Sequence, residues 1–114
     1  MNQVVGMYVV GGITLVSEIA LPELPLIQQQ SASLHPVAIR LGKVPRILSD
    51  AVEVDPGCFA TTRQYLLCVA GIARYLVTEG REIVVDPEVN AVPLDVRAYL
   101  LRSEEHTSEL QSPA

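Results

Sequence analysis

Few side chains in this chain combine a reactive type with a spacing that suits chemistry. Ser17 and Glu18 are adjacent and Glu23 follows closely, so a hydroxyl and two carboxyl groups could form an acid–base site. His35 could carry a proton or bind a metal. Prolines flank these residues, however, and a Ser-Glu pair beside a Pro-rich turn more often closes that turn. We therefore expect the Ser and Glu residues to act structurally and His35 to lie on the surface.

Two cysteines, Cys58 and Cys68, lie ten residues apart in a β-rich stretch. They could form a disulfide bond or supply half of a metal site, but no histidine lies nearby to complete that site. Free cysteines are among the most buried residue types, so we predict buried, apolar thiols. The sequence thus predicts no catalytic residue, no cofactor-binding residue and no metal ligand, and by default a reducing, cytoplasmic location.

Arg74 and Arg81 flank a predicted hairpin and could contact a phosphate group or a protein partner. Single charges on strands usually face solvent or pair with a neighbour such as Glu82, and we expect the same here. The net charge of the chain is −5, its pI is near 4.9, and its Lys and Arg residues are scattered singly. This balance argues against nucleic acid as a partner, because a nucleic-acid interface needs a basic patch.

Length and composition predict one globular domain. The chain has 114 residues, of which 49% are hydrophobic and 18% are charged. The apolar stretch Val4–Val16 is too short to span a bilayer, which takes roughly 20 apolar residues. It also lacks the basic residues that open a signal peptide. We expect a strand pair or a bulged strand there, and no membrane partner.

Alternating hydrophobicity and turn signals predict a mainly antiparallel β structure. The ranges with strand character are Met7–Val16, Pro36–Leu41, Gln64–Val69, Ile72–Val77 and Glu82–Val85. Thr78–Arg81 is expected to join the last two as a hairpin loop, with Gly80 at the position that needs a positive φ. Asp50–Gly57 is expected to be irregular and to end in a turn.

A helix is predicted to begin at Pro93, and helical spacing places Leu94, Ala98 and Leu101 on one apolar face. A helix of about two turns is marginal unless it packs, so we expect it to be truncated. The predicted fold class is α+β: a small antiparallel β-rich domain with hairpins, followed by a truncated C-terminal helix. The aromatic side chains expected in core or interface contacts are Tyr8, Tyr65, Tyr75 and Tyr99.

The last residues of the chain, Arg102–Ala114, are polar and break the apolar pattern of the helix. Some of them could be taken for metal ligands or a His–Ser–Glu constellation: Glu104, Glu105, His106 and Ser108. The stretch resembles the translation of a short-read sequencing adapter, and we therefore exclude it from functional reasoning. The expected division is residues 1–101 as the domain and 102–114 as an artefactual tail. The domain then carries ten acidic and seven basic side chains.

Several stretches of the domain together resemble the N-terminal region of HPr-kinase-like serine kinases, which are related to HPr kinase/phosphorylase. Those stretches, in chain order, are Tyr8 with Gly12-Ile13, Ser17-Glu18, Leu21–Leu24, Gly42–Pro45, Val69–Val77, Gly80–Ile83, Val85–Pro87 and Leu94–Leu101. The resemblance implies an ATP-dependent serine kinase as the parent protein, with ATP and Mg²⁺ as its cofactors and a protein or peptide serine as its substrate. The phosphate-binding loop of that family lies downstream of the helix and is missing here.

The one Gly-Lys pair, Gly42-Lys43, is followed by Val44 and lacks the upstream glycine of a phosphate-binding loop. The resemblance therefore implies a non-catalytic accessory domain, against which the missing kinase domain docks near Tyr99, Leu100 and Leu101. The alternative is a stand-alone β-rich interaction or ligand-binding module without catalysis. A small enzyme using Glu18, Glu23 or His35 is a third reading, which the spacing of these residues does not favour.

Overall fold

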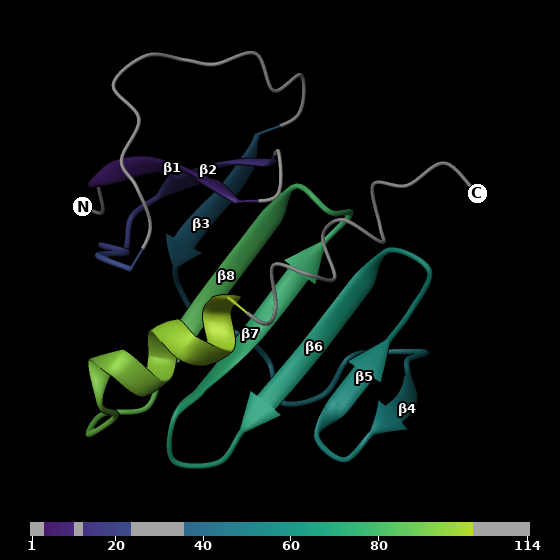
Figure 1. Ribbon diagram of the computed structural model, residues 1–114. Coiled ribbons are helices and arrows are strands. Elements are labelled where there is room, and N and C mark those ends of the chain that lie inside the picture. The colour runs from purple at the N-terminus through teal and green to yellow at the C-terminus, as the bar shows by residue number, and fades with distance from the viewer. Residues whose placement is uncertain (1–3, 11–12, 24–35, 102–114) are drawn as a thin grey trace.

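The computed structural model describes residues 4–10, 13–23 and 36–101 (Figure 1). Within these residues, the strands form one eight-stranded mixed sheet in the order β1-β2-β3-β8-β7-β6-β5-β4. The strands are β1 (Gly6–Val10), β2 (Ile13–Ser17), β3 (Val37–Leu41), β4 (Val52–Asp55), β5 (Cys58–Ala60), β6 (Gln64–Val69), β7 (Ala73–Thr78) and β8 (Glu82–Pro87). A helix covers residues 93–101. The predicted α+β class is confirmed.

Most neighbouring strands are antiparallel, as predicted. Strands β4 to β8 form a continuous antiparallel meander, and β1 and β2 form a separate hairpin. Strand β3 joins these two parts because it lies parallel to both β2 and β8. The sheet is therefore mixed, and the sequence alone did not indicate its parallel pairs. The helix among the described residues is too short to cross a membrane.

The predicted strand pair and the predicted hairpin loop at Gly80 are present. The apolar start forms the β1–β2 pair, in which Met7 lies opposite Val16. The turn between β7 and β8 contains Gly80 with φ 69° and Glu79 with φ 53°. Two successive residues with positive φ suit the twist of a tight hairpin, and glycine adopts this conformation without steric cost.

The core lies on the face of the sheet that the helix covers at β7 and β8 (Figure 1), and it extends to residues of β1, β2, β3 and β6. Along β7, Ala73, Tyr75 and Val77 alternate with less buried residues and are fully excluded from solvent. Ile83 and Val85 of β8 bury their side chains on the same face. The Tyr75 hydroxyl donates a hydrogen bond of 2.7 Å to the main-chain carbonyl of Val96, so the sheet and the helix are joined by a buried polar contact.

The opposite face of the sheet is crossed by the segment that connects β3 to β4, which Figure 1 shows running behind β8 and β7. Val44 of this segment is 3% exposed. Its amide donates to the Asp86 carboxylate at 3.0 Å, and its carbonyl accepts from Nε of Arg74 at 2.9 Å. These hydrogen bonds hold the β3–β4 connection against both β7 and β8.

Two predictions were wrong in detail. Asp50–Gly57 is not wholly irregular, because Val52–Asp55 forms the edge strand β4. The signal for a strand was weak there, since all four of its side chains are exposed and no buried face marks its period. The apolar docking face expected at Tyr99, Leu100 and Leu101 also differs in the structure, because Leu100 is buried with Val96 against the sheet.

Candidate functional site

Ser17 and Glu18 stabilise the chain where it leaves β2. The Ser17 hydroxyl is fully buried, donates to the carbonyl of Ile19 at 2.6 Å and accepts from the amide of Ile19 at 2.9 Å. Oε1 of Glu18 accepts a hydrogen bond of 3.0 Å from the amide of Leu41 at the end of β3. Ser17 thus makes the local main-chain contacts that the predicted turn role requires, whereas Glu18 binds a main-chain group of a strand distant in sequence.

Glu23 pairs with the helix. Nε of Arg97 lies 3.0 Å from each carboxylate oxygen of Glu23, and NH2 of Arg97 also lies 3.0 Å from Oε2. The hydrogen bond from Arg97 lowers the pKa of Glu23 below its ordinary value. A carboxylate held ionised by an arginine is a poor general base at neutral pH, so this geometry favours a structural role. His35 lies outside the described residues.

Arg74 is not a free cation. It donates to Oδ2 of Asp86 at 2.9 Å, and Asp86 also accepts from the Val44 amide. Partial burial alone would raise the pKa of Asp86, but the hydrogen bonds from Val44 and Arg74, with the charges of Arg74 and Lys43, lower it overall. Arg81 is exposed at the hairpin turn, and its guanidinium forms no ion pair with the described residues.

Two main-chain donors at the Gly42-Lys43 segment, the amides of Gly42 and Val44, are already engaged. The Gly42 amide donates to the carbonyl of Val85 at 3.0 Å, and the Val44 amide donates to Asp86. A phosphate cradle needs several adjacent amides directed at the anion. The amides of Gly42 and Val44 are instead bonded to residues of β8.

Cys58 and Cys68 are free thiols on the adjacent strands β5 and β6, and both are half-buried. Cys58 lies opposite Leu67, so by strand alternation Cys68 presents its side chain to the other face of the sheet. Two cysteines on opposite faces do not have the geometry of a disulfide bond. Burial raises the pKa of the Cys68 thiol. Within the described part of the chain, no three His, Cys, Asp or Glu side chains lie close enough together to hold a metal ion.

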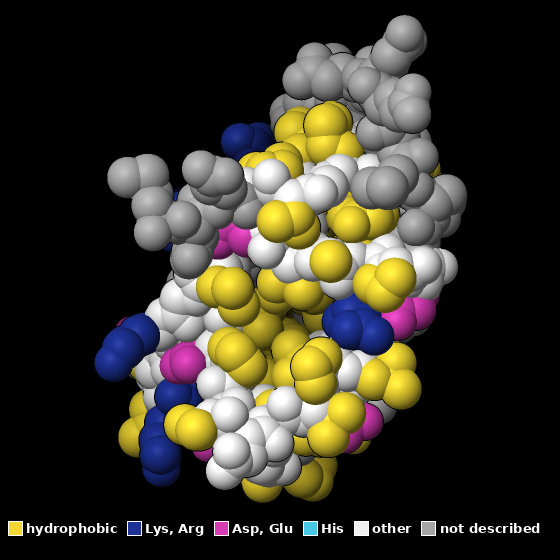
Figure 2. All heavy atoms as spheres, turned by 90° about the vertical axis from the view of Figure 1, so that its left-hand side faces the viewer, with side chains coloured by type: hydrophobic (Ala, Val, Ile, Leu, Met, Phe, Trp, Pro, Cys, Tyr) yellow, Lys and Arg dark blue, Asp and Glu magenta, His cyan; other side chains and the backbone are white. Residues whose placement is uncertain are grey.

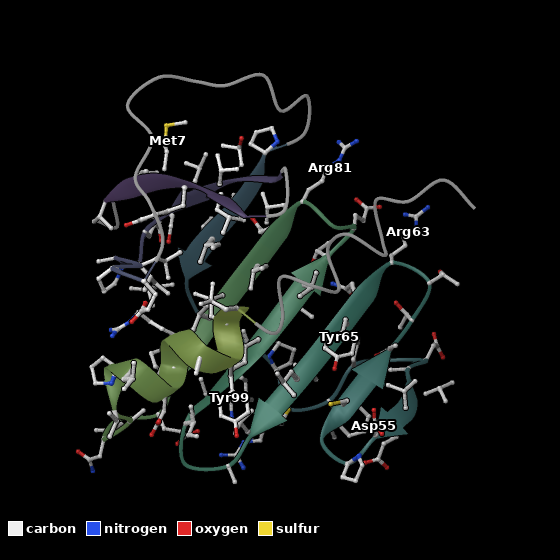
Figure 3. The ribbon with its side chains drawn as sticks, viewed as in Figure 1. Met7, Asp55, Arg63, Tyr65, Arg81 and Tyr99 are labelled. Atoms are coloured by element: carbon white, nitrogen blue, oxygen red, sulfur yellow. The ribbon has the colours of Figure 1, made fainter. Side chains whose placement is uncertain are left out.

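A cleft of about 630 Å³ opens on the helix side of the sheet, between Tyr99 and strands β4 to β6. Figure 3 shows Tyr65 and Tyr99 on this side, with Asp55 at the far edge. The described residues that line the cleft are Val54, Asp55, Pro56, Cys58, Tyr65, Leu67, Cys68, Val69, Ala70 and Tyr99. Sequence reasoning missed the cleft, because one of its walls is the unpredicted strand β4.

The outer face of the helix is apolar as well. Leu94 is 58% exposed, Ala98 is exposed and Leu101 is half-buried, so the predicted apolar stripe points away from the sheet. The approach to the helix adds Val89 and Val92, which are 97% and 55% exposed. Polar residues would be expected on the outer face of a helix that merely covers a sheet.

Beside this stripe lies an apolar hollow of about 370 Å³, between the start of the helix and the ends of β3 and β8. Figure 2 shows hydrophobic side chains gathered around a hollow on this side of the molecule. Among the residues predicted to receive a partner, Leu100 is fully buried in the core of this chain, while Tyr99 and Leu101 are half-buried. The exposed apolar surface thus lies on the opposite side of the helix from Leu100.

In comparisons with protein-family models, with curated proteins and with solved structures, no match to this chain was found.

Proposed function

We propose that this chain is a non-catalytic docking domain, the N-terminal part of an ATP-dependent, cytoplasmic HPr-kinase-like serine kinase. The observation that carries the proposal is the outward apolar stripe of the helix, which comprises Leu94, Ala98 and Leu101. Exposed apolar side chains that gather on one face are typical of a surface that another protein domain covers. The order of motifs that resembles this kinase family supports the proposal that this other domain is the kinase core.

The stripe and the neighbouring hollow together suit a folded partner that presents apolar side chains. Val89 and Val92 extend the apolar area toward the hollow, and the carboxylates of Glu18 and Glu88 lie on its rim. Arg97, the cation among the described residues that line the hollow, is already paired with Glu23. A partner surface with an apolar centre and basic residues at its edge would therefore be complementary in charge.

In this proposal the chain positions the kinase core and takes no part in the chemical step. The amides of Gly42 and Val44 are bonded within the sheet, so the nucleotide and its Mg²⁺ would be held by the kinase core. The helix, which packs on the sheet with its inner face, would present the docking surface to that core. The serine-bearing substrate would likewise be bound and phosphorylated there.

The experiment begins with the reading frame. The transcript of the parent gene, sequenced past the codon for Leu101, should encode a Gly-rich loop ending in Gly-Lys-Ser/Thr within a few dozen residues. The kinase core, expressed separately, should then bind this chain, and Leu94→Glu should weaken that binding. Val54→Glu, an exposed valine on the distant strand β4, is the matched control. The proposal is overturned by a frame without such a loop, or by equal binding of the two variants.

A second candidate is a stand-alone ligand-binding module, and the cleft beside Tyr99 favours it. Its volume of about 630 Å³ is within the range of small-molecule sites. Two aromatic rings, Tyr65 and Tyr99, and the carboxylate of Asp55 would suit an apolar molecule that carries a cation. Titration with tetraalkylammonium ions should quench tyrosine fluorescence in the wild type and not in Tyr99→Ala, and an unchanged signal in the wild type would exclude this candidate.

A further inference from the structure

The sheet ends in two different edge strands. Strand β4, at one end, is Val-Glu-Val-Asp, and its register with β5 shifts between Glu53 and Asp55. Charged side chains and register irregularities are the devices that protect an edge strand from pairing with another chain. Strand β1, at the other end, lies in the run Val4–Val10, which contains neither a charge nor a proline. The β1 edge thus lacks the protection that the β4 edge has.

The hydrogen bonds of β2 show which main-chain groups of β1 face outward. The Glu18 amide donates to Ile39 of β3 at 2.9 Å, so alternate residues of β2 are directed to β3 and the others, Leu15 and Ser17, to β1. The partners of Leu15 and Ser17 on β1 are Tyr8 and Gly6. By the same alternation, the amides and carbonyls of Met7 and Val9 point away from β2. No other strand in the described part of the chain lies beyond them.

We propose that β1 pairs in an antiparallel manner with β1 of a second copy of this chain, about a two-fold axis at Tyr8. The amide and carbonyl of Met7 then pair with those of Val9 of the second copy, and the axis generates the reverse pairing. The two sheets become one continuous sheet. This inference rests on the strand edge alone and is independent of the proposed kinase domain.

The side chains of β1 suit this self-pairing. Met7 and Val9 are half-buried and lie on the same face of the strand, and Figure 3 shows Met7 pointing away from the body of the sheet. In the paired sheet each Met7 lies opposite Val9 of the second copy, which makes an apolar cross-strand contact on both sides of the axis.

A two-fold axis places each strand opposite its own sequence, so an uncharged strand is compatible with it. The same operation at β4 would bring the carboxylates of Glu53 and Asp55 into mutual contact, and like charges directly opposite one another are destabilising. The choice of a second copy as the partner follows from this difference. Edge pairing alone buries a small area, so we expect a reversible dimer with a Kd on the order of 10–100 μM.

The test uses sedimentation equilibrium of the full chain and two charged variants. Met7→Lys and Val9→Glu should each raise the dimer Kd by about tenfold or more. Each variant places a charge opposite an apolar residue and near the same charge of the second copy. An equimolar mixture of the two variants should recover dimers, because Lys then lies opposite Glu. Val54→Lys, on the β4 edge, should leave the Kd unchanged, and circular dichroism establishes that each variant is folded.

Amide hydrogen exchange of the wild type gives a measurement that needs no variant. The amides of Met7 and Val9 should be protected at high protein concentration and should exchange quickly at low concentration. The inference is overturned if the chain is monomeric at all concentrations, or if Val54→Lys is the variant that dissociates the dimer. Dimers that the charged variants do not weaken, or a mixture that does not recover them, would overturn it as well.

Discussion

The Tyr75 hydroxyl and the Val96 carbonyl form a 2.7 Å hydrogen bond between strand β7 and the helix. Both residues are buried, and Tyr75 is fully excluded from solvent. The helix is short, and a helix of this length depends on packing for its stability. The bond therefore helps to fix the position of the helix on the sheet, and with it the direction of the outward apolar stripe.

Replacement of Tyr75 by Phe should loosen the helix without removing the ring from the core. We expect a loss of about 1 kcal/mol in the free energy of unfolding, the net value of a typical buried hydrogen bond. Urea denaturation measures this loss, and amide exchange should show that protection falls first in residues 93–101. Equal loss of protection across β6 to β8 would contradict a local role for the bond.

The same tyrosine predicts a response to alkaline pH. Burial, with the nearby Tyr99 and Asp95, raises the pKa of Tyr75 well above its ordinary value. Because the folded-state pKa is raised, its contribution to stability is full below the unfolded pKa of about 10 and is lost as the pH rises beyond that. The melting temperature of the wild type should therefore fall more steeply above pH 10 than that of Tyr75→Phe. Parallel curves for the two proteins would refute this assignment.

On the other face, Asp86 should contribute to stability in a pH-dependent way. Its pKa is lowered in the folded state, so its contribution is present above the unfolded pKa of about 4 and is lost as the pH falls through the lowered value. Asp86→Asn should cost about 1 kcal/mol at neutral pH, and the difference from the wild type should shrink in acid. Thermal melts between pH 7 and pH 2 measure both effects.

Glu82→Gln is the matched control for that experiment. Glu82 pairs with Arg40 at 3.1 Å, but these side chains are 35% and 56% exposed, whereas those of Asp86 and Arg74 are 23% and 21% exposed. Exposed ion pairs are screened by solvent, so the loss should be below about 0.5 kcal/mol. Equal destabilisation by Glu82→Gln and Asp86→Asn would show that the hydrogen bond from the Val44 amide to Asp86 adds nothing to stability.

Two glycines with similar backbone angles should respond differently to alanine. Gly57 and Gly71 have φ of 78° and 76°, so alanine is strained at either position. A Cβ at Gly57 would also lie 2.7 Å from the carbonyl oxygen of Cys68, whereas nothing lies within 4 Å of one at Gly71. We expect a loss of about 1 kcal/mol for Gly71→Ala and of about 2 kcal/mol or more for Gly57→Ala. Urea denaturation of the two variants side by side gives the comparison.

The strands with clear alternation and strong turn signals could be predicted from the sequence. β6 has the predicted bounds, and the turn at Gly80 has the predicted positive φ. Long-range features could not be predicted. The position of β3 between β2 and β8 depends on contacts between distant segments, and no local pattern encodes it. The same holds for the ion pair that joins Glu23 to Arg97.

The helix shows a second kind of limit. It carries apolar residues on two faces, and periodicity identified the stripe of Leu94, Ala98 and Leu101 while the sheet in fact covers Val96 and Leu100. Periodicity reports that a face is apolar and not which partner covers it. The apolar stripe was therefore found in the sequence, but only the structure shows that it points away from the sheet.

The same substitution at two leucines of the helix tests this assignment of faces. Leu100 is fully buried and Leu94 is 58% exposed. Leu100→Ala should lower the free energy of unfolding by about 2–5 kcal/mol, because it removes packed atoms and leaves a cavity, while Leu94→Ala should change it by less than about 0.5 kcal/mol. Urea denaturation of the isolated chain distinguishes the two values. Equal losses would mean that the helix packs through Leu94 as well, and the outward stripe would then be unavailable to a partner.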